Sequence, residues 1–110
     1  MRGEYQVIYS PAALDDLRHI FNYIAHVLLA GQAAQNQIVH IRKEIRKLDL
    51  FPEKHEQVDW EPWVSMGTRK MSVDNYVVYY RVDNESKSVT IVRIFYGGRD
   101  VEHIIQDGIE

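Results

Sequence analysis

The chain has 110 residues, of which 45% are hydrophobic and 26% are charged, and this indicates one domain, 1–110, with a single modest core. A formal net charge of −3 argues against a nonspecific nucleic-acid binder, and the absence of cysteine excludes disulfides and thiolate chemistry. No apolar run is long enough to span a membrane and no signal-peptide segment opens the chain, so we expect a cytoplasmic protein without a membrane partner.

A short strand followed by a helix is predicted at the start of the chain. Residues 5–9 are β-branched and aromatic, and Ser10 and Pro11 suit the N-cap and the first position of a helix. Asp15 and Asp16 follow near the positive end of the helix dipole. Apolar residues then recur at a spacing of three and four, which predicts one buried stripe formed by Leu14, Leu17, Phe21, Ile24 and Leu28.

A second helix is predicted after Gly31, which marks a break between the two. Its apolar residues alternate four- and three-residue steps at Ala34, Ile38, Ile41, Ile45 and Leu48. Phe51-Pro52 closes this helix, because a residue before proline is pushed out of the helical region. The two helices therefore form an αα-hairpin.

Residues 55–66 show no period, and we interpret them as an ordered loop whose Trp60 and Trp63 cover one end of the core. Three runs rich in Val, Ile, Tyr and Phe follow within residues 67–100 and predict an antiparallel meander. A short terminal helix is expected after them, with Asp100 as its N-cap.

The predicted fold class is α+β in the order β-α-α-β-β-β-α, with the helical hairpin packed on a twisted, mainly antiparallel four-stranded sheet. Strict alternation along the last strand places Arg93 and Phe95 on the same face as Val89 and Ile91. One face of the sheet covers the hairpin. We expect the other face to expose aromatic and arginine side chains and to bind nucleic acid, an acidic partner or a peptide segment.

Several stretches in the right order resemble the RelE/ParE superfamily of toxins from toxin–antitoxin modules. Residues 75–82 resemble its Tyr-Arg-x-x-Tyr-x-Val strand, and residues 93–100 resemble its Arg-x-x-His-x-x-Arg-Asp ending. The opening Tyr-x-Val-x-Tyr-Ser-Pro-x-Ala of residues 5–13 and Phe51-Pro52 are also similar to ParE-like members. The resemblance covers nearly the whole chain.

This resemblance implies a growth-inhibiting toxin that a cognate antitoxin neutralises. ParE-like members poison DNA gyrase without being enzymes, whereas RelE-like members are endoribonucleases that cut messenger RNA on the ribosome. The chain departs from the RelE-like pattern at Val77, Tyr96 and Ile105, where that pattern has an arginine, a histidine and a tyrosine. These departures, the long hairpin and the net charge favour the ParE-like target. The alternatives are the RelE-like ribonuclease and a degenerate, non-toxic module that only binds antitoxin.

RNA cleavage needs a base, an acid and cations on the phosphate, and the candidate residues follow from that need. We predict catalytic roles for Arg81, Arg93, Tyr96 and Arg99. We predict target or phosphate binding for Arg69, Lys70 and His103.

Structural roles remain open for several of these residues. Arg81 and Arg93 could instead form cross-strand pairs with Asp83 or Glu85. Arg99 could hold loop carbonyls. His19 and His26 lie about 10 Å apart along a helix, too far to share a metal ion, so we predict neither a metal site nor a cofactor.

Overall fold

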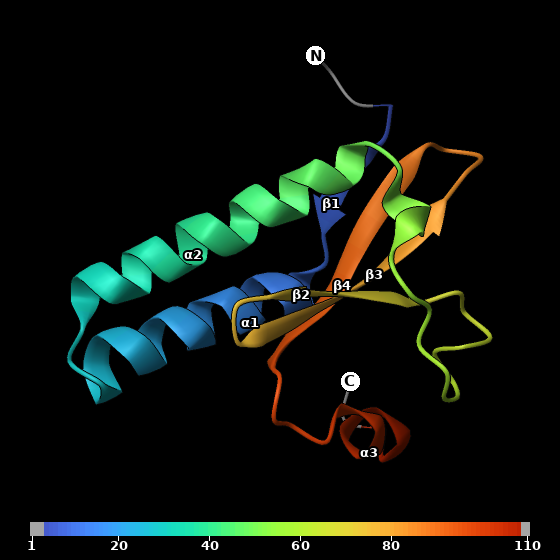
Figure 1. Ribbon diagram of the computed structural model, residues 1–110. Coiled ribbons are helices and arrows are strands. Elements are labelled where there is room, and N and C mark those ends of the chain that lie inside the picture. Colours follow the sequence, from blue (N-terminus) through green and yellow to red (C-terminus); the bar gives the residue numbers. More distant parts are fainter. Residues whose placement is uncertain (1–3, 109–110) are drawn as a thin grey trace.

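The computed structural model describes residues 4–108, and within them a helical hairpin packs on a four-stranded sheet (Figure 1). The main elements are β1 (Gln6–Tyr9), α1 (Pro11–Asn22), α2 (Gly31–Arg46), β2 (Arg69–Val73), β3 (Tyr76–Asp83), β4 (Ser88–Tyr96) and α3 (Val101–Gln106). The sheet order is β1-β4-β3-β2, with β1 parallel to β4 and the other neighbours antiparallel. The predicted α+β class and element order are confirmed.

The predicted capping residue starts α1. The Ser10 hydroxyl accepts a hydrogen bond from the Ala13 N–H at 3.0 Å, and Pro11 occupies the first helical position. The helix continues as a π-helical turn, Tyr23–Val27, and Gly31 is the first residue of α2. The predicted break between the two helices is thus confirmed.

The predicted stripe of α1 is only partly correct. Leu17 and Ile24 are buried, but Leu14 and Leu28 are 41% and 55% exposed. The π-helical turn changes the spacing after Asn22, so Leu28 leaves the buried face. Leu14 lies beside the face that carries Ala13 and Leu17 against the sheet, and it remains outside the core.

The end of α2 also differs in detail. The α-helix stops at Arg46, a 3₁₀ turn covers Lys47–Asp49, and Phe51 adopts a left-handed conformation with φ 51°. Pro52 then starts a second 3₁₀ turn, Pro52–Lys54, whose first carbonyl accepts a hydrogen bond from the buried Tyr80 hydroxyl at 2.5 Å. The helical region therefore ends before Phe51-Pro52 rather than at it.

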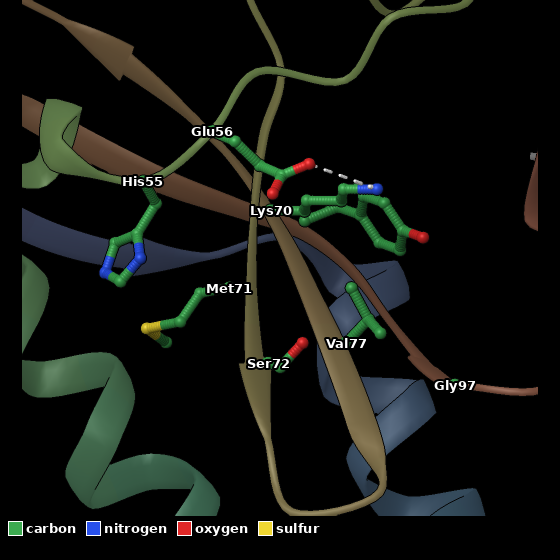
Figure 2. Close-up of a pocket in the computed structure, with 8 residues that line it drawn as sticks. His55, Glu56, Lys70, Met71, Ser72, Val77 and Gly97 are labelled. Atoms are coloured by element: carbon green, nitrogen blue, oxygen red, sulfur yellow. Dashed lines mark ion pairs between the residues drawn. The ribbon is translucent and has the colours of Figure 1, made fainter.

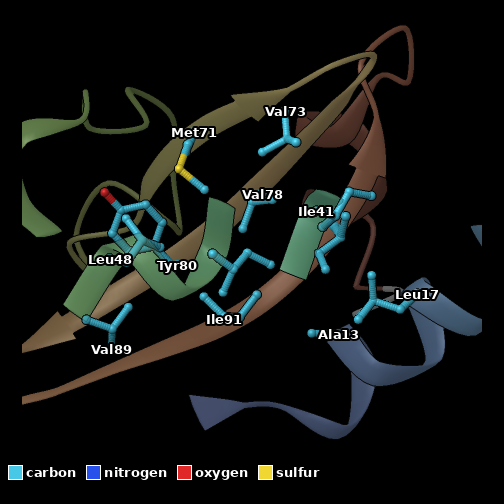
Figure 3. Packing of buried hydrophobic residues seen from close by; sticks show 12 residues of the cluster. Ala13, Leu17, Ile41, Leu48, Met71, Val73, Val78, Tyr80, Val89 and Ile91 are labelled. Carbon is cyan, nitrogen blue, oxygen red and sulfur yellow. The ribbon is translucent and has the colours of Figure 1, made fainter. Parts of the chain in front are cut away.

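The main core lies between the hairpin and one face of the sheet (Figure 3). Its fully buried members come from both layers and include Ala13, Ile41, Ile45, Leu48, Val78, Tyr80, Val89 and Ile91. Burying roughly 100–200 Å² per large side chain is the main source of stability for such a layer pair.

A β-bulge in β4 reverses the predicted alternation. Tyr79 pairs with Arg93 and Tyr80 pairs with Ile91, so Val92 is the extra residue. Ile94 therefore enters the core beneath the hairpin, while Phe95 turns to the opposite face. The prediction that Arg93 and Phe95 share a face with Val89 and Ile91 was wrong, because an inserted residue shifts the two-residue period by one.

The opposite face of the sheet carries a second core, contrary to the exposed surface that we expected. Val58, Trp63, Tyr79, Phe95, Val101 and Ile105 are all buried there. Trp63 has no exposed surface, and Trp60 stacks on it with ring centroids 5.0 Å apart. The loop before β2 and helix α3 provide the apolar cover. The two tryptophans pack as predicted, but in this second core rather than over one end of the main core.

Candidate functional site

Arg69, a predicted phosphate ligand at the start of β2, holds the preceding loop. Its Nη1 donates to the carbonyl oxygens of Glu53 at 3.0 Å and His55 at 2.7 Å. The loop carbonyls thus occupy one edge of the guanidinium, and a target phosphate would have to bind elsewhere on it.

Arg81 on β3 lies at the border of the second core. Its Nε donates to the hydroxyl of the buried Thr68 at 2.9 Å. Its guanidinium carbon lies 5.8 Å from the ring centroid of Trp63. Arg81 therefore fastens β3 to the segment that enters β2. These contacts are not the cross-strand pair predicted with Asp83 or Glu85.

Arg93 on β4 makes a bidentate ion pair with Asp16 on α1. Its Nε lies 2.8 Å from Oδ2 and its Nη2 lies 3.0 Å from Oδ1, and the two side chains are only 16% and 10% exposed. The same carboxylate accepts the Ile94 N–H at 2.8 Å. The partner of Arg93 is therefore Asp16, not Asp83 or Glu85.

The role of Asp16 was missed from the sequence. We expected Asp15 and Asp16 to interact with the helix dipole, but neither lies in the first turn of α1. Asp15 is exposed and pairs with Arg18, whereas Asp16 is buried at the edge of β4. The sequence signal that could have indicated a buried carboxylate was the position of Asp16, directly before Leu17 in the predicted buried stripe.

Tyr96 ends β4, Arg99 lies in the turn that follows, and His103 lies in the first turn of α3. Tyr96 is 55% exposed, and its ring contacts Tyr76 edge-on at 5.9 Å. The Arg99 guanidinium lies 5.3 Å from the ring of Phe95, on which Arg93 also lies at 4.4 Å. This end of the sheet thus brings three of the predicted residues, Arg93, Tyr96 and Arg99, to one region.

An open pocket of about 300 Å³ lies between the loop, β2 and β3 (Figure 2). It is lined by His55, Glu56, Lys70, Met71, Ser72, Val77, Tyr79 and Gly97. Figure 2 shows Lys70 facing Glu56, and the Nζ–Oε2 distance is 3.6 Å. Ser72 and Val77 are cross-strand partners within the pocket.

The pocket has limited capacity for a phosphate. Among its lining residues Lys70 provides the formal positive charge, and Glu56 offsets that charge. Val77 stands where the RelE-like pattern has arginine. Burial lowers the pKa of His55, and the charges of Lys54 and Arg69 lower it further, so this imidazole is neutral at neutral pH. The pocket therefore offers a proton acceptor but little charge stabilisation.

The predicted residues thus lie in three places. Lys70 lines the pocket, Arg69 and Arg81 fasten the segments around Thr68, and the others lie at the end of β4 or the start of α3. Their catalytic and binding roles stay predictions. Within residues 4–108 no three side chains of the metal-binding types gather in a group that could hold an ion. No helix of that same part of the chain is long and apolar enough to cross a membrane.

The cap of α3 should titrate as a unit. Asp100 accepts the His103 N–H, and its Oδ2 lies 2.5 Å from His103 Nδ1. This hydrogen bond raises the pKa of His103 and lowers the pKa of Asp100. The contact is therefore fully present between the ordinary pKa values of the two groups, 3.8 and 6.5. It weakens as pH rises through the raised pKa of His103 or falls through the lowered pKa of Asp100.

We expect an NMR titration of the His103 ring to give a pKa above 6.5, and Asp100→Asn to bring it down. The Asn side chain keeps an oxygen that can cap the helix but removes the charge. An unchanged His103 titration in Asp100→Asn would show that the carboxylate does not control this imidazole.

The family was identified by comparison with known proteins. The sequence model of the family described as ParE toxin of type II toxin-antitoxin system, parDE, matches residues 7–101. Curated protein sequences gave no significant match.

Solved structures share the fold at low identity. A chain of the chromosomal ParDE system from P. aeruginosa superposes with a TM-score of 0.71 at 19% identity, covering 84% of this chain and 96% of that one. A chain of the toxin–antitoxin complex RelBE2 from Mycobacterium tuberculosis superposes with a TM-score of 0.63 at 20% identity, covering 86% of this chain and 92% of that one. A mutant of the E. coli toxin RelE in the free state superposes with a TM-score of 0.60 at 12% identity, covering 99% of this chain and 96% of that one. Because the family model spans most of the sequence, this chain belongs to the ParE toxin family of type II toxin–antitoxin systems, within the RelE/ParE superfamily.

Proposed function

We propose that this chain is a toxin that stops growth by inhibiting DNA gyrase and that a cognate antitoxin neutralises it. ParE-like members of the superfamily act on gyrase, and the matching family is described by the parDE module. Such a target implies action in the cytoplasm. A gyrase inhibitor of this kind is not an enzyme, whereas a ribonuclease needs positive charge at the site of cleavage. The electrostatics of the candidate site therefore distinguish the two functions.

The observation that carries the proposal is the state of three cations that a cleavage site would need: Lys70 in the pocket, and Arg69 and Arg93 outside its lining. Cleavage of RNA needs positive charge on the phosphate as negative charge develops in the transition state. Here Lys70 is paired with Glu56, Arg93 is paired with Asp16, and Arg69 is bonded to loop carbonyls. With Val77 in place of an arginine, Lys70 is the cation that lines the pocket, and the Glu56 carboxylate offsets its charge.

A RelE-like ribonuclease is the second candidate, and one feature favours it. The pocket combines the neutral imidazole of His55 with Ser72 and Lys70, so a proton acceptor and a cation lie near each other. Purified chain incubated with programmed ribosomes distinguishes this candidate, because only the ribonuclease produces cuts at fixed codon positions.

Arg99→Ala is expected to weaken gyrase inhibition by about tenfold or more, the loss typical of an interface arginine. Arg99 is exposed in the turn after β4, and its contact with Phe95 contributes only about 0.5–1 kcal/mol. Folding should therefore be almost unchanged. The measurement is supercoiling of relaxed plasmid by purified gyrase with increasing amounts of the chain.

Arg18→Ala is the matched control, because Arg18 is an exposed arginine on α1 whose pair with Asp15 is also exposed. It should inhibit gyrase like the wild type. If Arg99→Ala inhibits equally well, Arg99 does not contact the target. If it fails to accumulate as folded protein, Arg99 serves as an anchor of the fold.

A further inference from the structure

The turn of the helical hairpin exposes an unusual amount of apolar surface. Tyr23, Val27, Leu28 and Leu29 are 54%, 63%, 55% and 85% exposed, and together they form what we call the hairpin-tip surface. Figure 1 shows this turn at the end of α1 and α2 that projects away from the sheet. Single exposed leucines are ordinary in proteins, but neighbouring ones at the end of a projecting element mark a binding surface.

The sequence around this surface carries no formal charge. Residues 19–41 contain no Asp, Glu, Lys or Arg, although charged residues make up 26% of the whole chain. A surface that meets only water gains solubility from charge. The uncharged stretch is therefore suited to a partner that removes it from water, and it is unsuited to nucleic acid, whose binding depends on cations.

The hairpin-tip surface extends toward a predicted target-contacting residue. Tyr23 and Tyr96 both lie near Tyr76, since the two hydroxyls add to burial in raising the pKa of Tyr76. The rings of Tyr76 and Tyr96 touch edge-on at 5.9 Å. A partner that extends from Tyr23 past Tyr76 would therefore reach Tyr96.

The exposed side of α2 changes character along its length. Val39 is 60% exposed, and three- and four-residue spacing places Arg42, Lys43, Arg46 and Lys47 on the same side of the helix. Glu44 pairs with Lys47 at 2.9 Å, so the C-terminal half keeps a net positive charge. A partner lying along this side would meet first an uncharged surface and then a basic one.

This charge pattern selects one occupant. A second copy packed along α2 would bring basic residues against basic residues if the twofold axis ran parallel to the helix. It would bring them against the uncharged tip if the axis were perpendicular. A different chain with an apolar segment followed by acidic residues would match both halves. The family to which the chain belongs provides a second protein as the candidate, because it is described as the toxin of a toxin–antitoxin system.

We propose that the antitoxin covers the hairpin-tip surface with an apolar segment and continues with acidic residues along the basic half of α2. The inference rests on the antitoxin part of the proposed function and does not depend on gyrase being the target. It also gives a route to neutralisation, since the bound segment shields Tyr96 together with Tyr23.

The test measures binding of the protein encoded by the small open reading frame next to this gene, using titration calorimetry with the purified full-length chain. Val27→Glu and Leu29→Glu should each weaken binding by roughly 30-fold or more, the size of an interface hot spot. Met66→Glu is the matched control, because Met66 is an equally apolar residue, 50% exposed, in the loop before β2. It should change the affinity by less than about threefold.

The basic half of α2 is tested separately by salt. Arg46→Glu should weaken binding and reduce the dependence of the affinity on salt concentration, because it removes an attraction that salt screens. Lys54→Glu, an exposed cation in the 3₁₀ turn Pro52–Lys54 rather than on α2, is the control. Circular dichroism of every variant confirms that the fold is intact, which is expected because each replaced side chain is largely exposed.

Growth assays separate this inference from the proposed function. Leu29→Glu should still arrest growth, but co-expression of the neighbouring protein should no longer relieve the arrest. A variant that loses toxicity while binding the neighbouring protein normally would assign the surface to the target and overturn the proposal. Unchanged affinity in both tip variants, or no complex between the wild-type chain and the neighbouring protein, would also overturn it. So would a wild-type chain that is dimeric in solution and becomes monomeric in Leu29→Glu.

Discussion

Asp16→Ala is expected to lower the free energy of unfolding by about 3–5 kcal/mol, the loss typical of breaking a buried ion pair. The substitution removes the two Asp16 hydrogen bonds of the Arg93 guanidinium and the acceptor of the Ile94 N–H. Both groups lie where water has little access. Urea unfolding followed by circular dichroism measures the effect.

Asp15→Ala is the control for this prediction. The neighbouring carboxylate is exposed and its pair with Arg18 is screened by water, so its removal should cost less than about 1 kcal/mol. In the double variant Asp16→Ala/Arg93→Ala the loss should be smaller than the sum of the single losses, because both members of the ion pair are removed together. Equal losses for Asp15→Ala and Asp16→Ala would contradict the structural role given to the Asp16–Arg93 pair.

Trp63→Ala is expected to cost about 3–5 kcal/mol, because it leaves a large cavity in the second core. The Trp63 ring has no exposed surface, stacks on Trp60 and lies 4.9 Å from the ring of Tyr79. It also supports the guanidinium of Arg81. Thermal unfolding monitored by the remaining tryptophan fluorescence and by circular dichroism measures the loss.

Trp60→Ala is the matched substitution, since Trp60 is only partly buried on the outer side of the same stack. Its loss should be less than half that of Trp63→Ala. If the two variants are equally stable, the second core does not depend on the buried ring, and the face of the sheet beneath α3 would be more open than described.

The order of elements could be predicted because the local signals and the tertiary structure agree. Ser10-Pro11 marks the start of α1, and Asp100 does cap α3. The β-bulge at Val92 could not be predicted, because an inserted residue leaves the β-branched and aromatic composition of a strand unchanged. That single residue decides which side chains of β4 face the hairpin, and with it the surroundings of Arg93.

The candidate site was less predictable than the fold for a physical reason. The sequence shows which residues carry charge, but not which charges are neutralised by neighbours from distant elements. Asp16 and Arg93 are far apart in the chain and in direct contact in the structure. Lys70 and Glu56 meet across a loop and a strand. The sequence alone showed that Val77 stands where the RelE-like pattern has arginine. The structure adds that Val77 lines the same pocket as Lys70.

Inducing the wild-type chain in cells without the neighbouring antitoxin gene tests the central claim most directly, with plasmid topology and message integrity measured in the same culture. Chloroquine gels should show loss of negative supercoiling as growth stops, since gyrase would no longer maintain it. Primer extension on ribosome-bound messages should show no new cuts at fixed codon positions. Codon-positioned cuts with unchanged supercoiling would contradict gyrase inhibition and assign the chain to the ribosome.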